Sequence, residues 1–317
     1  MILYSAVMID TTPSGPLSGL SGNLRGILFM FGSVMVISIM HVTVRYVSAE
    51  LHPFEIVFMR SFFGLIAIVP ILARQGRGAM RTGRPGLQAV RGMIGICALS
   101  TWFYSLSLMP VGDATALSFT AVIFTTIGAI VVLKERVGIR RWMAIFIGLS
   151  GTLIILRPGL QVVAPGALLV LVSTVLWATS LICVKVLTRT ESSVTVVFYS
   201  LIYFTVFSVI PAAMVWQWPT APQLGWLVMI GVLSTVGHLC LTQALKEAEA
   251  GVVMPMDYLR LIWTAGIGFL VFGEFPDLWT WVGGGVIFAS TLYITYREAR
   301  TKKAVVAGET LRARDGH

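Results

Sequence analysis

Long apolar runs recur along the entire chain and are separated by short polar segments. A helix that crosses a bilayer needs about 20 predominantly apolar residues, and ten runs approach or reach that length. The predicted spans are 26–44, 54–72, 91–109, 114–133, 142–156, 166–184, 194–215, 224–245, 252–272 and 278–296. Because the connections between them are brief, little of the chain remains for domains outside the membrane. The pattern therefore predicts an all-α membrane protein with ten transmembrane helices.

The second half of the chain repeats the pattern of the first. When the chain is shifted by 139 positions, residues 105–142 align with 244–281 without a gap, and Glu135 falls on Glu274. Because an odd number of spans precedes the second copy, that copy enters the membrane from the opposite side. The sequence thus predicts two inverted five-helix repeats, an arrangement typical of secondary transporters.

The repeat also predicts how the chain is divided. Near the start of each copy the offset is 140 positions, which places Ser33 over Ser173 and Arg45 over Lys185. The expected segments are a flexible cytoplasmic leader (1–23), a first repeat (24–160), a second repeat (161–298) and a basic cytoplasmic tail (299–317).

Composition and charge agree with a membrane protein. Of the 317 residues, 56% are hydrophobic and 12% are charged, against about 25% charged in a typical soluble domain. Most Lys and Arg fall in alternate connections and in the tail, whereas only Arg45 and Arg157 fall in the opposite connections. By the positive-inside rule both termini are expected in the cytoplasm. The net charge of +9 is therefore interpreted as an orientation signal and not as a nucleic-acid surface.

Motifs for several other classes of protein are missing from the sequence. It contains no GxxxxGK[ST], no GxGxxG in a βαβ setting, no HExxH and no GxSxG, which argues against nucleotide, zinc or serine-hydrolase chemistry. None of the three cysteines lies in a CxxC pair. We therefore expect no enzymatic activity, no cofactor and no metal.

Three stretches resemble a known family. They are HPFEIVFMRSFFG (52–64), DATALSFTAVIFTTIGAIVVLKERVGIRRWMAIFIGLSGTLIILRPG (113–159) and FGEFPDLWTWVGGGVIFAS (272–290). Each of the last two has an apolar span closed by a glutamate, a short turn, and then a span containing Trp and Gly. They are similar to the EamA-type branch of the drug/metabolite transporter superfamily. The resemblance implies a ten-helix transporter of small organic solutes in a bacterial inner membrane, with its fifth and tenth helices packed outside a central cavity. Similar members carry amino acids and related metabolites, S-adenosylmethionine or riboflavin.

Two charges interrupt the apolar stretch VVMPMDYLRLIWTA (252–265). A charge at the bilayer centre costs roughly 2.5–3.5 kcal/mol on insertion scales. On a helix, Asp257, Arg260 and Thr264 share one face because their spacings are three and four. In one interpretation Asp257 and Arg260 bind the amine and carboxylate of a zwitterionic solute. In the other they form an i,i+3 ion pair with each other.

Arg60 is a third charge within a predicted span. Three interpretations stay open for it: binding of an anionic group, pairing with Asp257 across the two halves, and extension of its side chain to the membrane surface. Glu55, at the start of the same span, is interpreted as an interfacial residue. Glu274, at the end of another span, is interpreted as a turn cap or a brace of a gate.

Histidines and aromatic residues within spans complete the candidate site. His41, His238 and Asp257 are candidates for proton coupling, because histidine titrates near neutral pH; a neutral packing role is the alternative for the histidines. Five aromatic residues lie well inside spans, where they either cage a flat or cationic solute or pack helices: Trp102, Tyr104, Trp177, Tyr199 and Trp263. Trp216 and Trp218 fall at a span end, as interfacial anchors do.

The sequence therefore predicts a secondary transporter of a small organic metabolite. The expected solute is an amino acid or a related amphoteric or aromatic compound that crosses the membrane by alternating access. Two other functions stay open: an intramembrane enzyme acting on a lipid-linked substrate, and a non-transporting membrane sensor or subunit. The expected partners are the solute and the bilayer, not nucleic acid. Glycines in the fifth and tenth spans also allow a homodimer.

Overall fold

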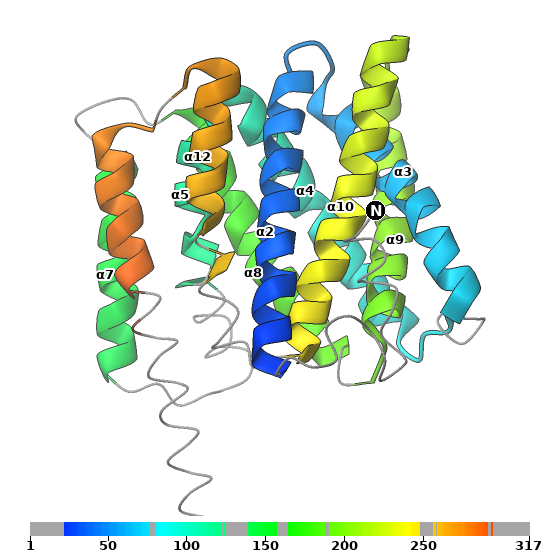
Figure 1. Ribbon diagram of the computed structural model, residues 1–317, viewed down its shortest axis with the longest axis horizontal. Helices are drawn as coiled ribbons and strands as arrows, with labels where there is room; N and C mark the ends of the chain where they lie inside the picture. The colour runs from blue at the N-terminus through cyan, green and yellow to red at the C-terminus, as the bar shows by residue number, and fades with distance from the viewer. Residues whose placement is uncertain are drawn as a thin grey trace, which may run out of the picture.

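The computed structural model shows a bundle of helices standing side by side (Figure 1). It describes residues 22–75, 80–121, 123–124, 139–156, 164–187, 190–247, 256–257, 259–274, 276–290 and 293. The labelled helices are α2 (Gly22–Val47), α3 (Pro53–Gln75), α4 (Pro85–Leu108), α5 (Val111–Ser118), α7 (Ile139–Leu156), α8 (Pro165–Leu187), α9 (Ser193–Met214), α10 (Ala221–Glu247) and α12 (Leu259–Phe272). A further helix covers Leu278–Ser290.

Six of these helices are long and apolar enough to cross a membrane, namely α2, α3, α4, α8, α9 and α10. Three shorter apolar helices lie at Phe146–Ile155, Leu259–Phe272 and Leu278–Ser290. The expected all-helical membrane class is confirmed in the described residues. The count of ten helices and the inversion stay predictions, since parts of the fourth and ninth predicted spans lie outside the described residues. The tail 299–317 and the leader up to residue 21 also lie outside them.

Local sequence explains where several helices begin and end. Proline is favoured in the first turn of a helix because it has no N–H to satisfy there, and Pro53, Pro85 and Pro165 each open a helix. The Ser192 side chain caps α9 by accepting from the Thr195 amide at 3.1 Å. Gly273 follows α12 with φ +68°, the left-handed conformation that often ends a helix. This turn positions the next residue, Glu274.

The two halves of the chain interlock through their first and third helices, because α2 packs along α10 and α8 packs along α4. The Ser33 hydroxyl donates to the Gly237 carbonyl at 2.8 Å. The Ser173 hydroxyl donates to the Ala98 carbonyl, also at 2.8 Å. Each residue of the second bond lies 139 or 140 positions from its counterpart in the first, so one contact recurs with the halves exchanged.

A second contact recurs in the same way. A Cβ added to Gly92 of α4 would lie 2.4 Å from Cβ of Tyr203 in α9, and one added to Gly231 of α10 would lie 2.6 Å from Cβ of Phe63 in α3. Both glycines are therefore required for close helix packing. Gly231 and Tyr203 are offset from Gly92 and Phe63 by the same 139 and 140 positions.

The pair formed by α7 and Leu278–Ser290 stands at one side of the bundle (Figure 1). A Cβ on Gly151 would lie 2.7 Å from the Gly283 carbonyl oxygen, and one on Gly283 would lie 2.5 Å from the Gly151 carbonyl oxygen. These glycines thus bring the two helices together within one chain. The homodimer that they were considered to allow stays a prediction.

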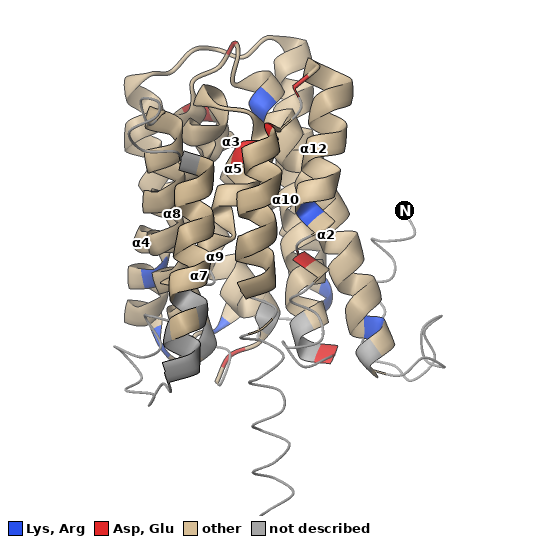
Figure 2. Cartoon of the chain, turned by 90° about the vertical axis from the view of Figure 1, so that its left-hand side faces the viewer, with Lys and Arg blue, Asp and Glu red and all other residues tan. Residues whose placement is uncertain are grey.

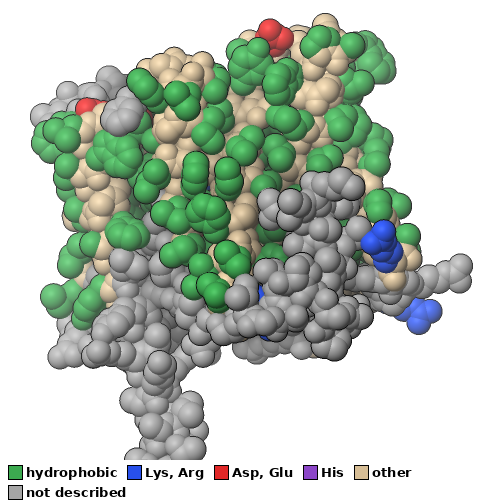
Figure 3. All heavy atoms as spheres, in the orientation of Figure 1, with side chains coloured by type: hydrophobic (Ala, Val, Ile, Leu, Met, Phe, Trp, Pro, Cys, Tyr) green, Lys and Arg blue, Asp and Glu red, His purple; other side chains and the backbone are tan. Residues whose placement is uncertain are grey.

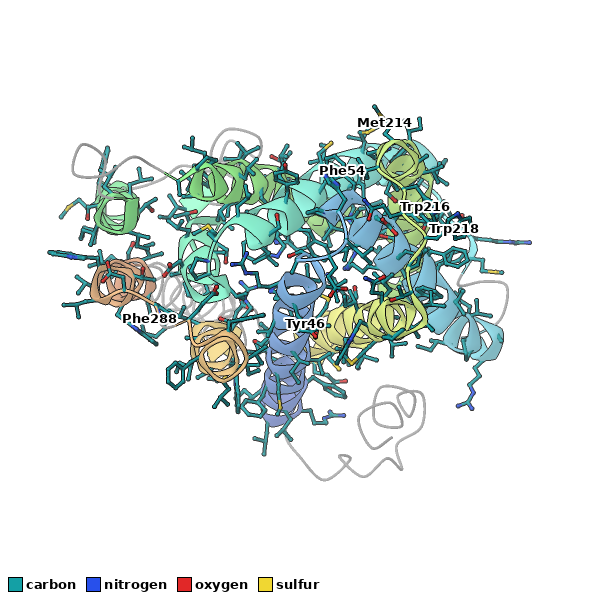
Figure 4. The ribbon with its side chains drawn as sticks, turned by 90° about the horizontal axis from the view of Figure 1, so that it is seen from above. Tyr46, Phe54, Met214, Trp216, Trp218 and Phe288 are labelled. Carbon is teal, nitrogen blue, oxygen red and sulfur yellow. The ribbon has the colours of Figure 1, made fainter. Side chains whose placement is uncertain are left out.

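The outer surface has the character of a lipid-facing bundle. Apolar side chains are spread over the part of the face that is not grey in Figure 3, and the charged side chains in view lie near its ends. In Figure 2 the described Lys and Arg residues lie mainly toward the lower end. We call the end that carries Val47 and Pro53 the upper end, as in Figure 1. Trp216 and Trp218 lie beside each other at one edge of the upper end, and Phe288 lies at the opposite side of the bundle (Figure 4).

Candidate functional site

Ionisable side chains from three other helices lie within electrostatic range of the buried His41. His41 of α2 lies within electrostatic range of Arg60 of α3, His238 of α10 and Arg260 of α12. With Asp257, which pairs with Arg260, we call these residues the central polar cluster. The first two belong to the first half of the chain and the others to the second half, so the cluster depends on both halves.

Asp257 and Arg260 form an ion pair. Arg260 Nη2 donates to Asp257 Oδ2 at 3.0 Å and lies 3.5 Å from the Ser118 hydroxyl. The guanidinium also lies over the Phe119 ring, 5.9 Å from its centroid. The side chains keep 34% of their exposure for Asp257 and 18% for Arg260. The i,i+3 pair considered from the sequence is therefore formed in this conformation.

Arg60 is buried, with 3% of its surface exposed, so its side chain does not extend to the membrane surface. Its guanidinium lies over the Phe103 ring, 5.8 Å from the centroid. Nε and Nη1 have no hydrogen-bond partner in the described part of the chain, and Asp257 is bonded to Arg260 instead. Arg60 thus lacks partners for part of its hydrogen-bonding capacity, which buried charged groups normally satisfy.

Each half contributes a histidine–tryptophan contact. Trp102 Nε1 donates to His41 Nε2 at 3.2 Å, so the neutral imidazole of His41 carries its proton on Nδ1. That buried nitrogen has no partner among the described residues. His238 Nδ1 donates to the Ser234 carbonyl at 2.9 Å, and the Trp177 ring meets the His238 ring edge to face at 6.5 Å. Trp102 and Trp177 therefore adjoin the central polar cluster through its two histidines.

The other three candidate aromatic residues make contacts elsewhere. The Tyr199 hydroxyl donates to the Met80 carbonyl at 2.9 Å. Trp263 meets the Phe31 ring at 6.2 Å and packs against a cluster of α2 and α10. Tyr104 adjoins the His52 ring and lines an open, mainly apolar groove formed by α4, α8 and α9. None of the contacts described for these three residues is with Arg60 or the Asp257–Arg260 pair.

At the upper end, Arg45 joins the two halves. Its Nη1 donates to the carbonyls of Leu106 at 3.0 Å and Ser107 at 2.6 Å, and its Nη2 donates to Glu274 Oε1 at 3.1 Å. The positive-φ turn at Gly273 places the glutamate there. Glu274 therefore braces α2 and α4 against the end of α12. Glu135, its counterpart in the repeat, lies outside the described residues.

At the lower end, Glu191 joins the halves in a different way. This residue precedes α9, and its carboxylate accepts from the Thr82 hydroxyl, from the Gly83 amide at 3.1 Å and from the Gln88 amide nitrogen at 2.6 Å. Hydrogen bonds to an ionised acceptor are stronger than neutral ones. One carboxylate thus holds the segment before α4 to the other half.

Sequence reasoning missed the burial of two charged residues near helix starts. Arg91 is 9% exposed; its Nη1 donates to the Val196 carbonyl at 3.2 Å and to the Ser200 hydroxyl. Glu55, interpreted as interfacial, is 0% exposed and accepts from the Gln217 amide at 3.3 Å. The sequence carried no signal for either, because a charge in the first two turns of a helix can face solvent, lipid or the bundle.

The central polar cluster can bind a polar solute by charge and hydrogen bonding, but it does not have the arrangement of a metal centre. Among the residues that the structure describes, no group of three or more His, Cys, Asp or Glu side chains is arranged to hold a metal ion.

Comparison with known proteins places this geometry in context. A model of the EamA-like transporter family matches residues 24–157 and again residues 164–296. The chain is 31% identical to the S-adenosylmethionine uptake transporter of Rickettsia prowazekii, over 88% of this chain and 95% of that protein. It is 30% identical to the riboflavin transporter of Vibrio cholerae, over 89% and 95%. The pseudopaline exporter CntI of Pseudomonas aeruginosa is 28% identical, over 88% and 97%.

A solved crystal structure gives a comparison of the fold alone. It superposes with a TM-score of 0.63 at 14% identity and covers 87% of this chain and 98% of its own. At this identity the match concerns the arrangement of helices and not the chemistry of the site.

Proposed function

Because the chain belongs to the EamA-like transporter family and is therefore a membrane transporter of small molecules, we propose that it moves an amphoteric or aromatic metabolite by alternating access. The solute binds at the central polar cluster, between the two halves. The observation that carries this proposal is that buried or half-buried charges from both halves, Arg60 and the Asp257–Arg260 pair, lie within electrostatic range of the buried His41. A site shared by two halves is exposed to one face of the membrane or the other as they rock.

Ten helices arranged as two inverted repeats are part of the proposal. The two separate family matches support it. So do the mirrored contacts, Ser33 with Gly237 and Ser173 with Ala98. If the halves exchange conformations during transport, each of these hydrogen bonds has an equivalent in the opposite half, and the two states have similar energies.

The proposed location is a bacterial inner membrane, with the lower end of the bundle and both chain termini in the cytoplasm. The bacterial relatives support the choice of membrane. The distribution of Lys and Arg toward the lower end supports the orientation (Figure 2). The upper end, with the Arg45–Glu274 pair, then faces the periplasm.

The solute class rests on the chemistry of the cluster. Guanidinium groups suit acidic groups, Asp257 suits an amine, and Trp102 and Trp177 suit a flat or cationic group. Relatives named for S-adenosylmethionine, riboflavin and pseudopaline make these the first compounds to consider. His41, His238 and Asp257 are the proposed proton-coupling groups.

The test has two stages. Purified protein is first screened for a rise in its thermal unfolding midpoint with S-adenosylmethionine, riboflavin and a set of amino acids. Compounds that stabilise it then enter flux assays in proteoliposomes, with and without a pH gradient. We expect saturable flux of at least one stabilising compound. Stabilisation without flux in either direction would instead favour the non-transporting sensor.

A further inference from the structure

Two buried arginines of the first half differ in one respect. Arg91 is 9% exposed and Arg60 is 3% exposed. Arg91 Nη1 donates to the Val196 carbonyl and the Ser200 hydroxyl, and only Nε of its buried nitrogens has no partner in the described residues. The Arg60 guanidinium has an aromatic ring beneath it, and its Nε and Nη1 have no hydrogen-bond partner in the described residues. Both side chains are buried, but Arg91 has two hydrogen-bond acceptors and Arg60 has more of its hydrogen-bonding capacity without a partner.

The register of the repeat accounts for the difference. Ser200 is offset from Arg60 by 140 positions, and Ile230 is offset from Arg91 by 139. The contact between Arg91 and Ser200 would therefore have its mirror image between Ile230 and Arg60. Ile230 is fully buried and has no polar atom in its side chain. The chain thus supplies a hydroxyl to one arginine and an apolar group at the equivalent place beside the other.

The charges in the central polar cluster also indicate that Arg60 lacks a partner. Asp257 neutralises Arg260, so the pair adds little net charge. Arg60 is then a cation that forms no ion pair with any described residue. A buried charge is costly unless it is paired, and the histidines nearby are not anions in any protonation state. Among the described residues no acidic side chain is bonded to Arg60, so an anionic group would stabilise it best.

We propose that Arg60 binds an acidic oxygen-bearing group of the transported solute, a carboxylate or a phosphate, while Asp257 and Arg260 stay paired with each other. The planar guanidinium fork matches both kinds of group with two parallel hydrogen bonds. The Phe103 ring beneath it holds the fork in position. This inference rests on the proposed function but changes which arginine binds the acidic group of the solute. That group binds Arg60 and not Arg260.

The experiment measures thermal stabilisation of the full-length protein by matched probes. One pair is S-adenosylmethionine and its decarboxylated analogue, which tests a carboxylate. The other is riboflavin 5′-phosphate and riboflavin, which tests a phosphate. The variants are Arg60→Gln, Arg60→Lys and, as a matched buried arginine, Arg91→Gln.

We expect Arg60→Gln to weaken binding of an acidic probe roughly tenfold to hundredfold, the range for a lost charged hydrogen bond. Arg60→Lys keeps the charge but loses the fork and should fall between wild type and Arg60→Gln. Binding of the non-acidic member of each pair should change little. Arg91→Gln should keep the wild-type preference for acidic probes.

The ligand-free proteins give an independent readout. Arg60→Gln should unfold at or above the wild-type midpoint, since an unsatisfied buried cation is removed, whereas Arg91→Gln should unfold below it. Equal affinity of wild type and Arg60→Gln for acidic probes would overturn the proposal. So would a ligand-free midpoint of Arg60→Gln as low as that of Arg91→Gln. If no probe stabilises the wild type, the proposed function loses its support, and the ligand-free comparison still decides the role of Arg60.

Discussion

Charged side chains at the ends of the bundle differ from those in its interior in how far their hydrogen-bonding atoms have partners. At the upper end Arg45 is bonded to two carbonyls and to Glu274, and at the lower end Glu191 is bonded to three donors. In the interior, Arg60 and His41 each keep buried nitrogens without a partner in the described residues. At the ends each cited charge has partners within the protein, with only Glu274 Oε2 left over, whereas Arg60 Nε and Nη1 and His41 Nδ1 have none among the described residues.

The difference separates two roles. The Arg45–Glu274 pair and the Glu191 bonds cross from one half of the chain to the other, so they stabilise the observed arrangement of the halves. Side chains in the interior have hydrogen-bonding capacity left over, which a polar solute can satisfy. The exception in the interior is the Asp257–Arg260 pair, where two opposite charges are paired and only Arg260 Nε lacks a partner among the described residues.

Breaking the Asp257–Arg260 ion pair should give the largest effect on stability. Asp257→Asn leaves Arg260 without its counter-charge. Removing one partner of a fully buried ion pair costs about 3–5 kcal/mol; because Asp257 retains 34% exposure, we expect about 2–3 kcal/mol. The double variant with Arg260→Gln should recover most of the loss. Thermal or denaturant unfolding of the four proteins of this double-mutant cycle measures the coupling, and additive losses would show that the pair is not coupled.

Removing the Glu191 carboxylate at the lower end should lower the stability by a smaller amount. Glu191→Ala deprives three donors of their acceptor, but Gly83 lies at an exposed site where water replaces the bond. We expect a loss of about 1–2 kcal/mol in the free energy of unfolding. Glu50→Ala is a matched control, because Glu50 accepts one exposed hydrogen bond from Gln223. Equal losses for the two variants would contradict a special role for Glu191.

Separating Arg45 from Glu274 should affect stability least. Partly exposed ion pairs are worth about 0.2–1 kcal/mol, and these side chains keep 21% and 30% of their exposure. The larger effect should be on conformation: Glu274→Gln should increase labelling by aqueous thiol reagents of a single cysteine placed at Ser118, added from the upper side. Reversing the charges with Arg45→Glu and Glu274→Arg together should restore part of the wild-type labelling. Labelling unchanged in Glu274→Gln would count against a gate.

Much of the fold was predictable from the sequence, because apolar length and loop charge dominate in a membrane. Arg60, Asp257 and Arg260 were recognisable for the same reason, since each interrupts an apolar run. Which of them pair was not predictable. Helical spacing puts Asp257 and Arg260 on one face, but the choice between Arg260 and Arg60 as the partner of Asp257 depends on how α3 and α12 are rotated.

The rotation of each helix about its own axis also explains why the environments of some residues were predicted wrongly or missed. Glu55 lies in the first turn of α3 and was expected at an interface, yet it is buried because that face of the turn meets the segment before α10. Tyr199 lies within a span, but its hydroxyl reaches the Met80 carbonyl. An apolar span has no hydrophobic stripe that marks its inner face, so sequence alone does not assign the direction of such side chains.

We expect the central polar cluster to be a water-accessible solute site between the two halves. A single cysteine at Ser118, which contacts Arg260, tests it in a background where Cys97, Cys183 and Cys240 are serine. Membrane-impermeant thiol reagents are added from either side, with and without a stabilising solute. The account predicts labelling by the aqueous reagent that is slowed at saturating solute. Labelling only by lipid-soluble reagents, with no protection by solute, would contradict it.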